Sequence, residues 1–184
     1  MMRLWHALRR ILGAGPQRGP LESRINRLTL TAQGAIRKQA GPVFLRGEHV
    51  YDPRLLIQRE ASFLVRLDGR HAPRLIASGD DWLEMEHCGE ELSAGNMPAD
   101  WREQIAAISA VLAEAGIVHR DIKPGNVLVK EGRLYLIDFG WAIWADEAPY
   151  LSPRELRADV PREHIYDNWI ALEWLLSSYA SSKT

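Results

Sequence analysis

The spacing of apolar residues changes several times along the chain, and two stretches have the period of an amphipathic helix. Apolar residues recur every three to four positions over residues 53–67 and again over 101–116. Asp52 is a good N-cap for the first helix, and Pro53 suits its first position. Gly116 is a suitable C-cap for the second. We therefore predict two helices with these bounds.

Shorter apolar runs, each bounded by turn residues, predict strands between and before these helices. Residues 26–31 and 35–39 flank a turn at Ala32-Gln33-Gly34 and predict a hairpin. Residues 72–86 predict two more strands around a turn at Gly79-Asp80. Strands and helices therefore occur in one chain, as in an α+β protein.

Two acidic residues and one asparagine lie in short polar turns at the ends of apolar runs. Asp121 and Asn126 are five positions apart, and Asp138 follows on the next strand, across a hairpin at Glu131-Gly132. Carboxylate and amide oxygens are ligands that Mg²⁺ prefers, whereas a further carboxylate can receive a proton. We predict that Asn126 and Asp138 are metal ligands and that Asp121 is catalytic.

The same segment resembles the protein-kinase-like phosphotransferases. Their catalytic loop reads H-R-D-x-x-x-x-N, which residues 119–126 match, and their metal-binding segment reads D-F-G, which residues 138–140 match. The joint match is specific, whereas a lone Asp-Phe-Gly recurs by chance. The alternative interpretation is a plain hairpin with solvated carboxylates in its turns.

The resemblance implies an α+β, two-lobed protein-kinase-like fold. Residues 24–86 would form an N-lobe with a small antiparallel sheet and one helix. Residues 87–184 would form a shortened, mainly helical C-lobe, after an N-terminal helix and linker in 1–23. The implied reaction transfers the γ-phosphate of ATP to a hydroxyl group, with ATP and Mg²⁺ as cofactors.

In this family a strand cation, held by a glutamate, binds the nucleotide phosphates. Aligning the chain with the V-A-I-K pattern puts Arg37 at the cation position, and a shift by one puts Lys38 there. Neighbouring strand residues face opposite sides, so only one can face the cleft. We favour Lys38, because lysine is the compact charge that the family uses. Glu60, the only acid in the helix 53–67, would be its partner.

Four further residues receive roles from the resemblance. Backbone groups around Glu86 and Cys88 would bind adenine, although Cys88 is equally well explained as a buried structural thiol. Lys123 would contact the γ-phosphate beside the catalytic aspartate. Asp167 would anchor the catalytic loop, and its alternative role is a helix N-cap.

Composition limits the partners and the compartment. The net charge of −1 leaves no overall electrostatic footprint for nucleic acid. The single cysteine allows no intrachain disulfide, which suits a reducing compartment. No apolar run is long enough to span a bilayer, and Arg9 and Arg10 interrupt any signal-peptide core. We therefore expect a cytoplasmic protein.

The N-terminal residues 1–13 form a basic, tryptophan-bearing amphipathic pattern. Such a helix can lie on the inner face of the membrane, or it can pack on its own domain. The first alternative would bring the site close to lipid-linked acceptors.

Three functions fit these patterns. The reduced lobes and the Arg37-Lys38-Gln39 and Arg59-Glu60 pairings resemble the lipopolysaccharide-core heptose and Kdo kinases, which usually have glycine where this chain has Arg120. The sequence His119 to Pro124 favours a Ser/Thr protein kinase instead. A pseudokinase scaffold would explain why no G-x-G-x-x-G precedes the lysine strand, but it has no need for Asp121, Asn126 and Asp138 together.

Overall fold

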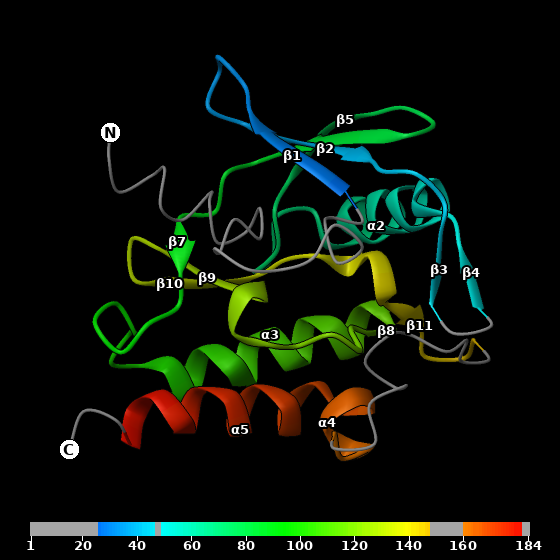
Figure 1. Ribbon diagram of the computed structural model, residues 1–184. Coiled ribbons are helices and arrows are strands. Elements are labelled where there is room, and N and C mark those ends of the chain that lie inside the picture. The colour runs from blue at the N-terminus through cyan, green and yellow to red at the C-terminus, as the bar shows by residue number, and fades with distance from the viewer. Residues whose placement is uncertain (1–25, 47–48, 148–159, 182–184) are drawn as a thin grey trace.

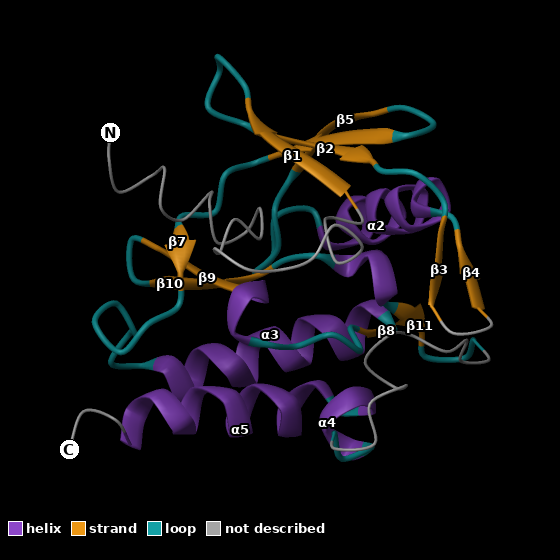
Figure 2. Cartoon of the chain, in the orientation of Figure 1, coloured by secondary structure: helices purple, strands orange, loops and turns teal. Residues whose placement is uncertain are grey.

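The computed structural model describes residues 26–46, 49–147 and 160–181, and this part of the chain is an α+β fold. A four-stranded antiparallel sheet and one helix lie on one side, and the longer remaining helices lie on the other (Figures 1 and 2). The predicted fold class is therefore confirmed. The predicted N-terminal helix lies outside the described residues, and the lobe boundary at residue 87 stays a prediction.

The sheet has the order β1-β2-β6-β5, and every neighbouring pair is antiparallel. Its strands are β1 (Asn26–Leu30), β2 (Ile36–Ala40), β5 (Leu75–Ser78) and β6 (Trp82–Met85). The hairpin predicted around Gly34 is present: Gly34 has a φ of 81°, and Thr31 Oγ1 accepts a hydrogen bond from the backbone N–H of Ala35 at 3.1 Å. The second predicted pair of strands is β5 and β6.

Helix α2 (Pro53–Leu67) packs beneath this sheet and has the predicted bounds. Asp52 Oδ1 accepts a hydrogen bond from the backbone N–H of Arg54 at 3.0 Å, which caps the helix, and Asp68 ends it in a left-handed conformation. Apolar burial drives its packing, because its buried stripe is apolar except for one residue, Glu60.

A small hairpin that the sequence patterns did not reveal precedes α2. Strands β3 (Phe44–Arg46) and β4 (His49–Tyr51) pair with each other and belong to no larger sheet within the described residues. Phe44 stacks on Tyr51 with ring centroids 5.1 Å apart, and Tyr51 meets the edge of Trp141 at 5.2 Å. Three-residue strands are too short to give a readable alternation.

The other side of the molecule is built on two long helices. These are α3 (Trp101–Ala115) and α5 (Asn168–Ser181), with the short α4 (Glu163–Tyr166) before the latter. Gly116 ends α3 with a φ of 70°, as predicted. One continuous apolar core joins buried residues of α2, α3 and α5. No helix in the described residues is long and apolar enough to cross a membrane.

Five short strands lie between the sheet and these helices. They position two polar segments, one with Asp121 and Asn126 and the other with Asp138. They are β7 (Glu90–Glu91), β8 (Ile117–Val118), β9 (Val127–Lys130), β10 (Arg133–Leu136) and β11 (Ile143–Trp144). β9 and β10 form the predicted hairpin, with Glu131 and Gly132 both at positive φ. β8 pairs with β11, and Ile137 donates its backbone N–H to the carbonyl of Asn126 at 3.0 Å. The two polar segments therefore lie side by side.

The glycine before β7 supports a close approach between two backbones. Gly89 has a φ of 93°, and a Cβ there would overlap the carbonyl oxygen of Val129 in β9. We expect Gly89→Ala to lower the free energy of unfolding by roughly 2 kcal/mol or more, because it adds both strain and overlap. Gly95→Ala is the control, since a Cβ at Gly95 meets only Ser93 Oγ at 3.8 Å. Equal melting temperatures for the two variants, measured by circular dichroism, would contradict this account.

Candidate active site

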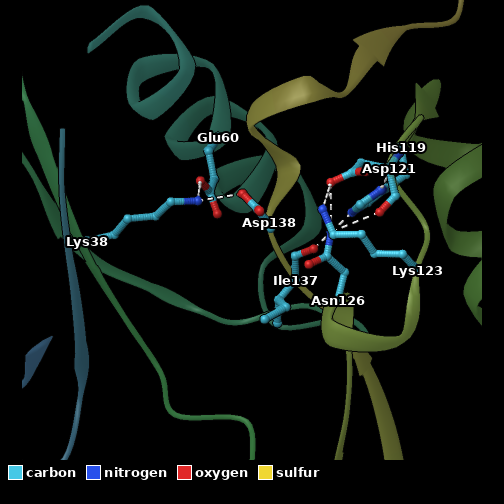
Figure 3. A network of polar contacts seen from close by, with 8 residues as sticks. All are labelled: Lys38, Glu60, His119, Asp121, Lys123, Asn126, Ile137 and Asp138. Carbon is cyan, nitrogen blue, oxygen red and sulfur yellow. Dashed lines mark hydrogen bonds and ion pairs between the residues drawn. The ribbon is translucent and has the colours of Figure 1, made fainter. Parts of the chain in front are cut away.

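Lys38 lies at the centre of the site, between two carboxylates from different elements. Its Nζ is 2.5 Å from Glu60 Oε2 on α2 and 2.6 Å from Asp138 Oδ1, which follows β10 (Figure 3). Only 5% of Lys38 is exposed. Arg37 faces the other side of the sheet, where its guanidinium carbon lies 3.8 Å from the centroid of the Trp82 ring. Of the two predicted alternatives, Lys38 is the cation that faces inwards.

The charges of these three residues depend on one another. Burial alone would lower the pKa of Lys38, but the charges of Asp138 and Glu60 outweigh it, so this pKa is raised. Burial likewise opposes ionisation of Asp138, yet Lys38 and then Lys123 lower its pKa to about 2. Burial raises the pKa of Glu60, and Lys38 offsets part of that effect. Asp138 is therefore an ionised carboxylate at neutral pH.

The backbone around Asp138 turns sharply to present this carboxylate. Asp138 has a left-handed conformation, with φ 66° and ψ 64°, and the 3₁₀ turn Phe139–Trp141 follows it. A Cβ at Gly140 would lie 3.4 Å from the Cβ of Leu56, so this turn packs directly against α2. Local backbone conformation and helix packing together position the carboxylate.

His119 connects the segment of Asp121 to the segment of Asp138. Its ring is fully buried, and Nδ1 accepts a hydrogen bond from the backbone N–H of Asp121 at 3.2 Å. Nε2 is 3.0 Å from the carbonyl of Ile137, the residue before Asp138. Since Nδ1 accepts, Nε2 is the nitrogen that donates. His119 thus joins the two segments through one ring.

Asp121, Lys123 and Asn126 form the second polar group of the site. Lys123 Nζ is 2.5 Å from Asp121 Oδ2, and Asn126 Nδ2 donates to the same oxygen at 3.0 Å and to the Asp121 carbonyl at 2.8 Å (Figure 3). These bonds engage the amide nitrogen of Asn126, so its oxygen is the atom that can ligate a metal. The sequence did not reveal this contact between Asn126 and Asp121.

An apolar pocket lies beside Glu86 and Cys88. Leu28 and Ile36 line it from the sheet, and Leu128 and Ile137 line it from the β9–β10 region; the other lining residues are Pro73, Met85, Glu86, His87, Cys88 and Gly89. Burial raises the pKa of the Cys88 thiol to about 12, so the thiol stays protonated at neutral pH. Cys88 is both a pocket-lining residue and a buried thiol.

The side chain of Glu86 forms an ion pair with Lys130. Its carboxylate pairs with Lys130 at 2.8 Å, and its backbone N–H donates to the carbonyl of Arg74 at 2.9 Å. The carbonyl oxygen of Glu86 is 3.7 Å from the Cys88 sulfur, a long contact. Backbone binding of adenine near Glu86 and Cys88 stays a prediction.

The predicted anchoring role of Asp167 is wrong, and the neighbouring Asn168 holds the catalytic loop instead. Asn168 Oδ1 accepts a hydrogen bond from the backbone N–H of His119 at 3.0 Å, and its Nδ2 donates to the carbonyl of Ile117 at 2.9 Å. Asp167 Oδ1 accepts from the backbone N–H of Ile170 at 3.0 Å, which is an N-cap bond. An amide suits the anchor because it donates and accepts at once, whereas an ionised carboxylate only accepts.

A buried lysine held by a helix glutamate, beside an Asp–Lys–Asn loop, resembles the arrangement found in phosphotransferases of the protein-kinase type. The sequence model of the phosphotransferase enzyme family (APH) matches residues 44–148, more than half of the 184-residue chain. The chain belongs to this enzyme family, which confirms the wider resemblance that the sequence indicated.

Individual relatives agree with this class. A probable serine/threonine-protein kinase BUD32 homolog from Archaeoglobus fulgidus is 28% identical over 107 residues, covering 56% of this chain and 53% of the relative. Serine/threonine-protein kinase kin-29 from Caenorhabditis briggsae is 36% identical over 125 residues, covering 54% of this chain and 15% of the relative. The chain spans about half the length of the first relative and a far smaller part of the second.

The two anchoring assignments can be separated by hydrogen exchange. We expect Asn168→Ala to speed exchange of the His119 amide by roughly tenfold or more, because that N–H loses its acceptor. Asp167→Ala is the matched control: it removes an exposed cap, worth about 1 kcal/mol, and leaves the His119 amide protected. The assignment fails if Asp167→Ala exposes the His119 amide more than Asn168→Ala does.

Removing the buried cation should make stability depend on pH. Lys38→Met leaves Glu60 buried without its partner, and we expect a loss of about 3 kcal/mol or more near neutral pH. The pKa of Glu60 is already raised by burial, so the folded variant binds more protons than the unfolded chain and loses stability as pH rises above about 4.3.

The loss of stability of Lys38→Met relative to the wild type should therefore be smaller when thermal unfolding is measured at pH 5 than at pH 8. Arg37→Met is the control, since Arg37 is partly exposed on the other face of the same strand. A deficit that is the same at both pH values would contradict the buried-pair account.

Proposed function

We propose that this protein is an ATP-dependent kinase that transfers the γ-phosphoryl group to a hydroxyl acceptor. The observation that carries the proposal is the close pairing of Lys38 with Asp138, next to an Asp121 carboxylate held by Lys123 and Asn126. Phosphoryl transfer needs little covalent help, and it depends on positioning and on charge neutralisation. Fixed cations and carboxylates of this kind meet both needs.

The apolar pocket supports the nucleotide part of the proposal. Leu28 and Ile36 of the sheet and Leu128 and Ile137 of the β9–β10 region line it, so a flat aromatic base would meet aliphatic groups from both parts of the chain. The backbone of Glu86 and Cys88 would supply polar contacts at one edge. Lys38, on the same strand as the lining residue Ile36, would then bind the phosphates.

The residues present also fit Mg²⁺. Asp138 offers an ionised carboxylate, and Asn126 offers an amide oxygen. No group of three or more His, Cys, Asp or Glu side chains in the described part of the chain could hold a metal alone. Mg²⁺ commonly takes one or two protein ligands and fills its shell with phosphate and water oxygens. When bound, Mg²⁺ neutralises phosphate charge.

The protein's own groups would then handle the acceptor. Asp121 would orient the hydroxyl by accepting its hydrogen bond, and would take the proton as the oxygen bonds to phosphorus. Lys123, whose side chain is half exposed, would offset the negative charge around the transferred group. Lys38 would keep the phosphates in line by holding their oxygens beside Asp138.

Two acceptor classes follow from different observations. The relatives named as serine/threonine kinases, together with the His119–Pro124 segment, support a protein hydroxyl as acceptor. The predicted resemblance to lipopolysaccharide-core kinases supports a sugar hydroxyl, presented at the inner membrane face through residues 1–13. A pseudokinase scaffold is the alternative outside catalysis.

Nucleotide binding and turnover separate the enzyme from the scaffold. We expect ATP to raise the melting temperature of the wild type only with Mg²⁺, and Asp138→Ala to abolish that shift. Asp121→Asn should keep the shift yet lower kcat by roughly 10²-fold or more, because it removes the proton acceptor. A wild type that never binds Mg²⁺-ATP would sink the kinase proposal, and binding without any turnover would support the scaffold.

The fate of labelled phosphate would then identify the acceptor class. The wild type would be given γ-labelled ATP and a cell lysate divided into protein, lipid and sugar fractions, with Asp121→Asn as the blank. Label in protein supports the serine/threonine alternative, and label in lipid or sugar supports the lipopolysaccharide-core alternative.

A further inference from the structure

Arg59 ties helix α2 to the chain segment that follows Asp138. Its Nη2 donates to the carbonyl of Ala142 at 3.1 Å and to Glu147 Oε2 at 2.7 Å, while its guanidinium carbon lies 5.7 Å from the Phe63 ring centroid. About a quarter of the Arg59 side chain is exposed (27%), and 30% of Glu147 is. The pair is therefore partly shielded from water, where an ion pair is stronger than on an open surface.

Glu147 is held in place by its own segment. Glu147 Oε2 also accepts the backbone N–H of Trp144 at 3.2 Å, and the Glu147 N–H donates to the carbonyl of Trp144 at 3.0 Å. The Trp144 ring packs on Phe63 of α2 at 4.7 Å. Arg59 thus meets a carboxylate whose position is already fixed, rather than a mobile surface acid.

Arg59 directly precedes Glu60 on the same helix. Glu60 holds α2 to Lys38, which in turn pairs with Asp138. Arg59 holds α2 to Ala142 and Glu147, further along the segment that follows Asp138. Neighbouring helix residues project about 100° apart. The buried apolar stripe sets the overall packing of the helix, and two polar contacts in different directions restrain its remaining rotation more than one contact would.

We propose that the Arg59–Glu147 pair is a clamp that positions Glu60, so that Lys38 stays paired with Glu60 and beside Asp138. Arg59 and Glu147 are positioning residues, since their contacts join α2 to the segment after Asp138 and they act through Glu60. The clamp rests on the proposed kinase function only for its kinetic consequence. Its structural consequence, the setting of the Glu60–Lys38 contact, is independent of catalysis.

The test uses the full chain with Arg59→Gln, Glu147→Gln and the double variant. Arg66→Gln is the matched control, because Arg66 is an exposed arginine on the same helix, seven residues further on. The first readout is the rate at which acetic anhydride modifies Lys38, followed by mass spectrometry. The second is kcat for ATP turnover, and the third is the melting temperature.

We expect Lys38 to be acetylated at least about threefold faster in both single variants, because a looser Glu60 exposes the amine and frees its lone pair. kcat should fall about tenfold, since the phosphate-binding lysine is misplaced. The double variant should be no worse than Arg59→Gln, as expected for partners in one interaction. Arg59→Lys, which keeps the charge, should recover part of both effects, and Arg66→Gln should resemble the wild type.

Unchanged acetylation of Lys38 in Arg59→Gln would overturn the clamp, whatever happens to turnover. Effects of the single variants that multiply in the double variant would also overturn it. Faster acetylation in a protein that shows no turnover even as wild type would support the clamp and refute the kinase function. A variant with a greatly lowered melting temperature is replaced by Arg59→Lys, whose Lys38 acetylation must then lie between those of wild type and Glu147→Gln.

Discussion

The structure depends on one buried cation shared by two carboxylates. Lys38 lies on a central strand, Glu60 on the helix below it and Asp138 a hundred positions further along the chain. Removing an ammonium group and carboxylates from water costs several kcal/mol per ion, and their mutual attraction offsets that cost only in close geometry. The sheet, α2 and the segment after β10 are therefore held to one relative arrangement, because any other leaves a charge buried without its counterion.

Much of the surrounding architecture serves that geometry. The apolar stripe of α2 fixes the depth of the helix under the sheet, and the turn at Gly140 packs against Leu56 of that helix. The β8–β11 pair and the Ile137–Asn126 hydrogen bond bring residues 119–126 next to the segment of Asp138. Apolar packing supplies the net stability, whereas the polar contacts select which packing is adopted.

Sequence patterns predicted the elements with strong periodicity and the residues within specific motifs. Helix α2 and the hairpins at Gly34 and Gly132 follow local rules of capping and turn chemistry, which depend on a few neighbouring residues. The choice of Asn168 over Asp167 could not be predicted, because both are good helix-start residues and only the tertiary contact with His119 distinguishes them. The Arg59–Glu147 pair joins residues 88 positions apart, with no local pattern to announce it.

His119 has a further consequence for how the site can evolve. Both nitrogens of its ring are engaged, one by the backbone of Asp121 and the other by the residue before Asp138. An imidazole ring is flat and rigid, so the distance between its two nitrogens sets the spacing between the segment of Asp121 and the segment of Asp138. Substitutions elsewhere can tilt the two segments together without changing that spacing. Residues around the two segments can therefore vary while the interval between Asp121 and Asp138 stays the same.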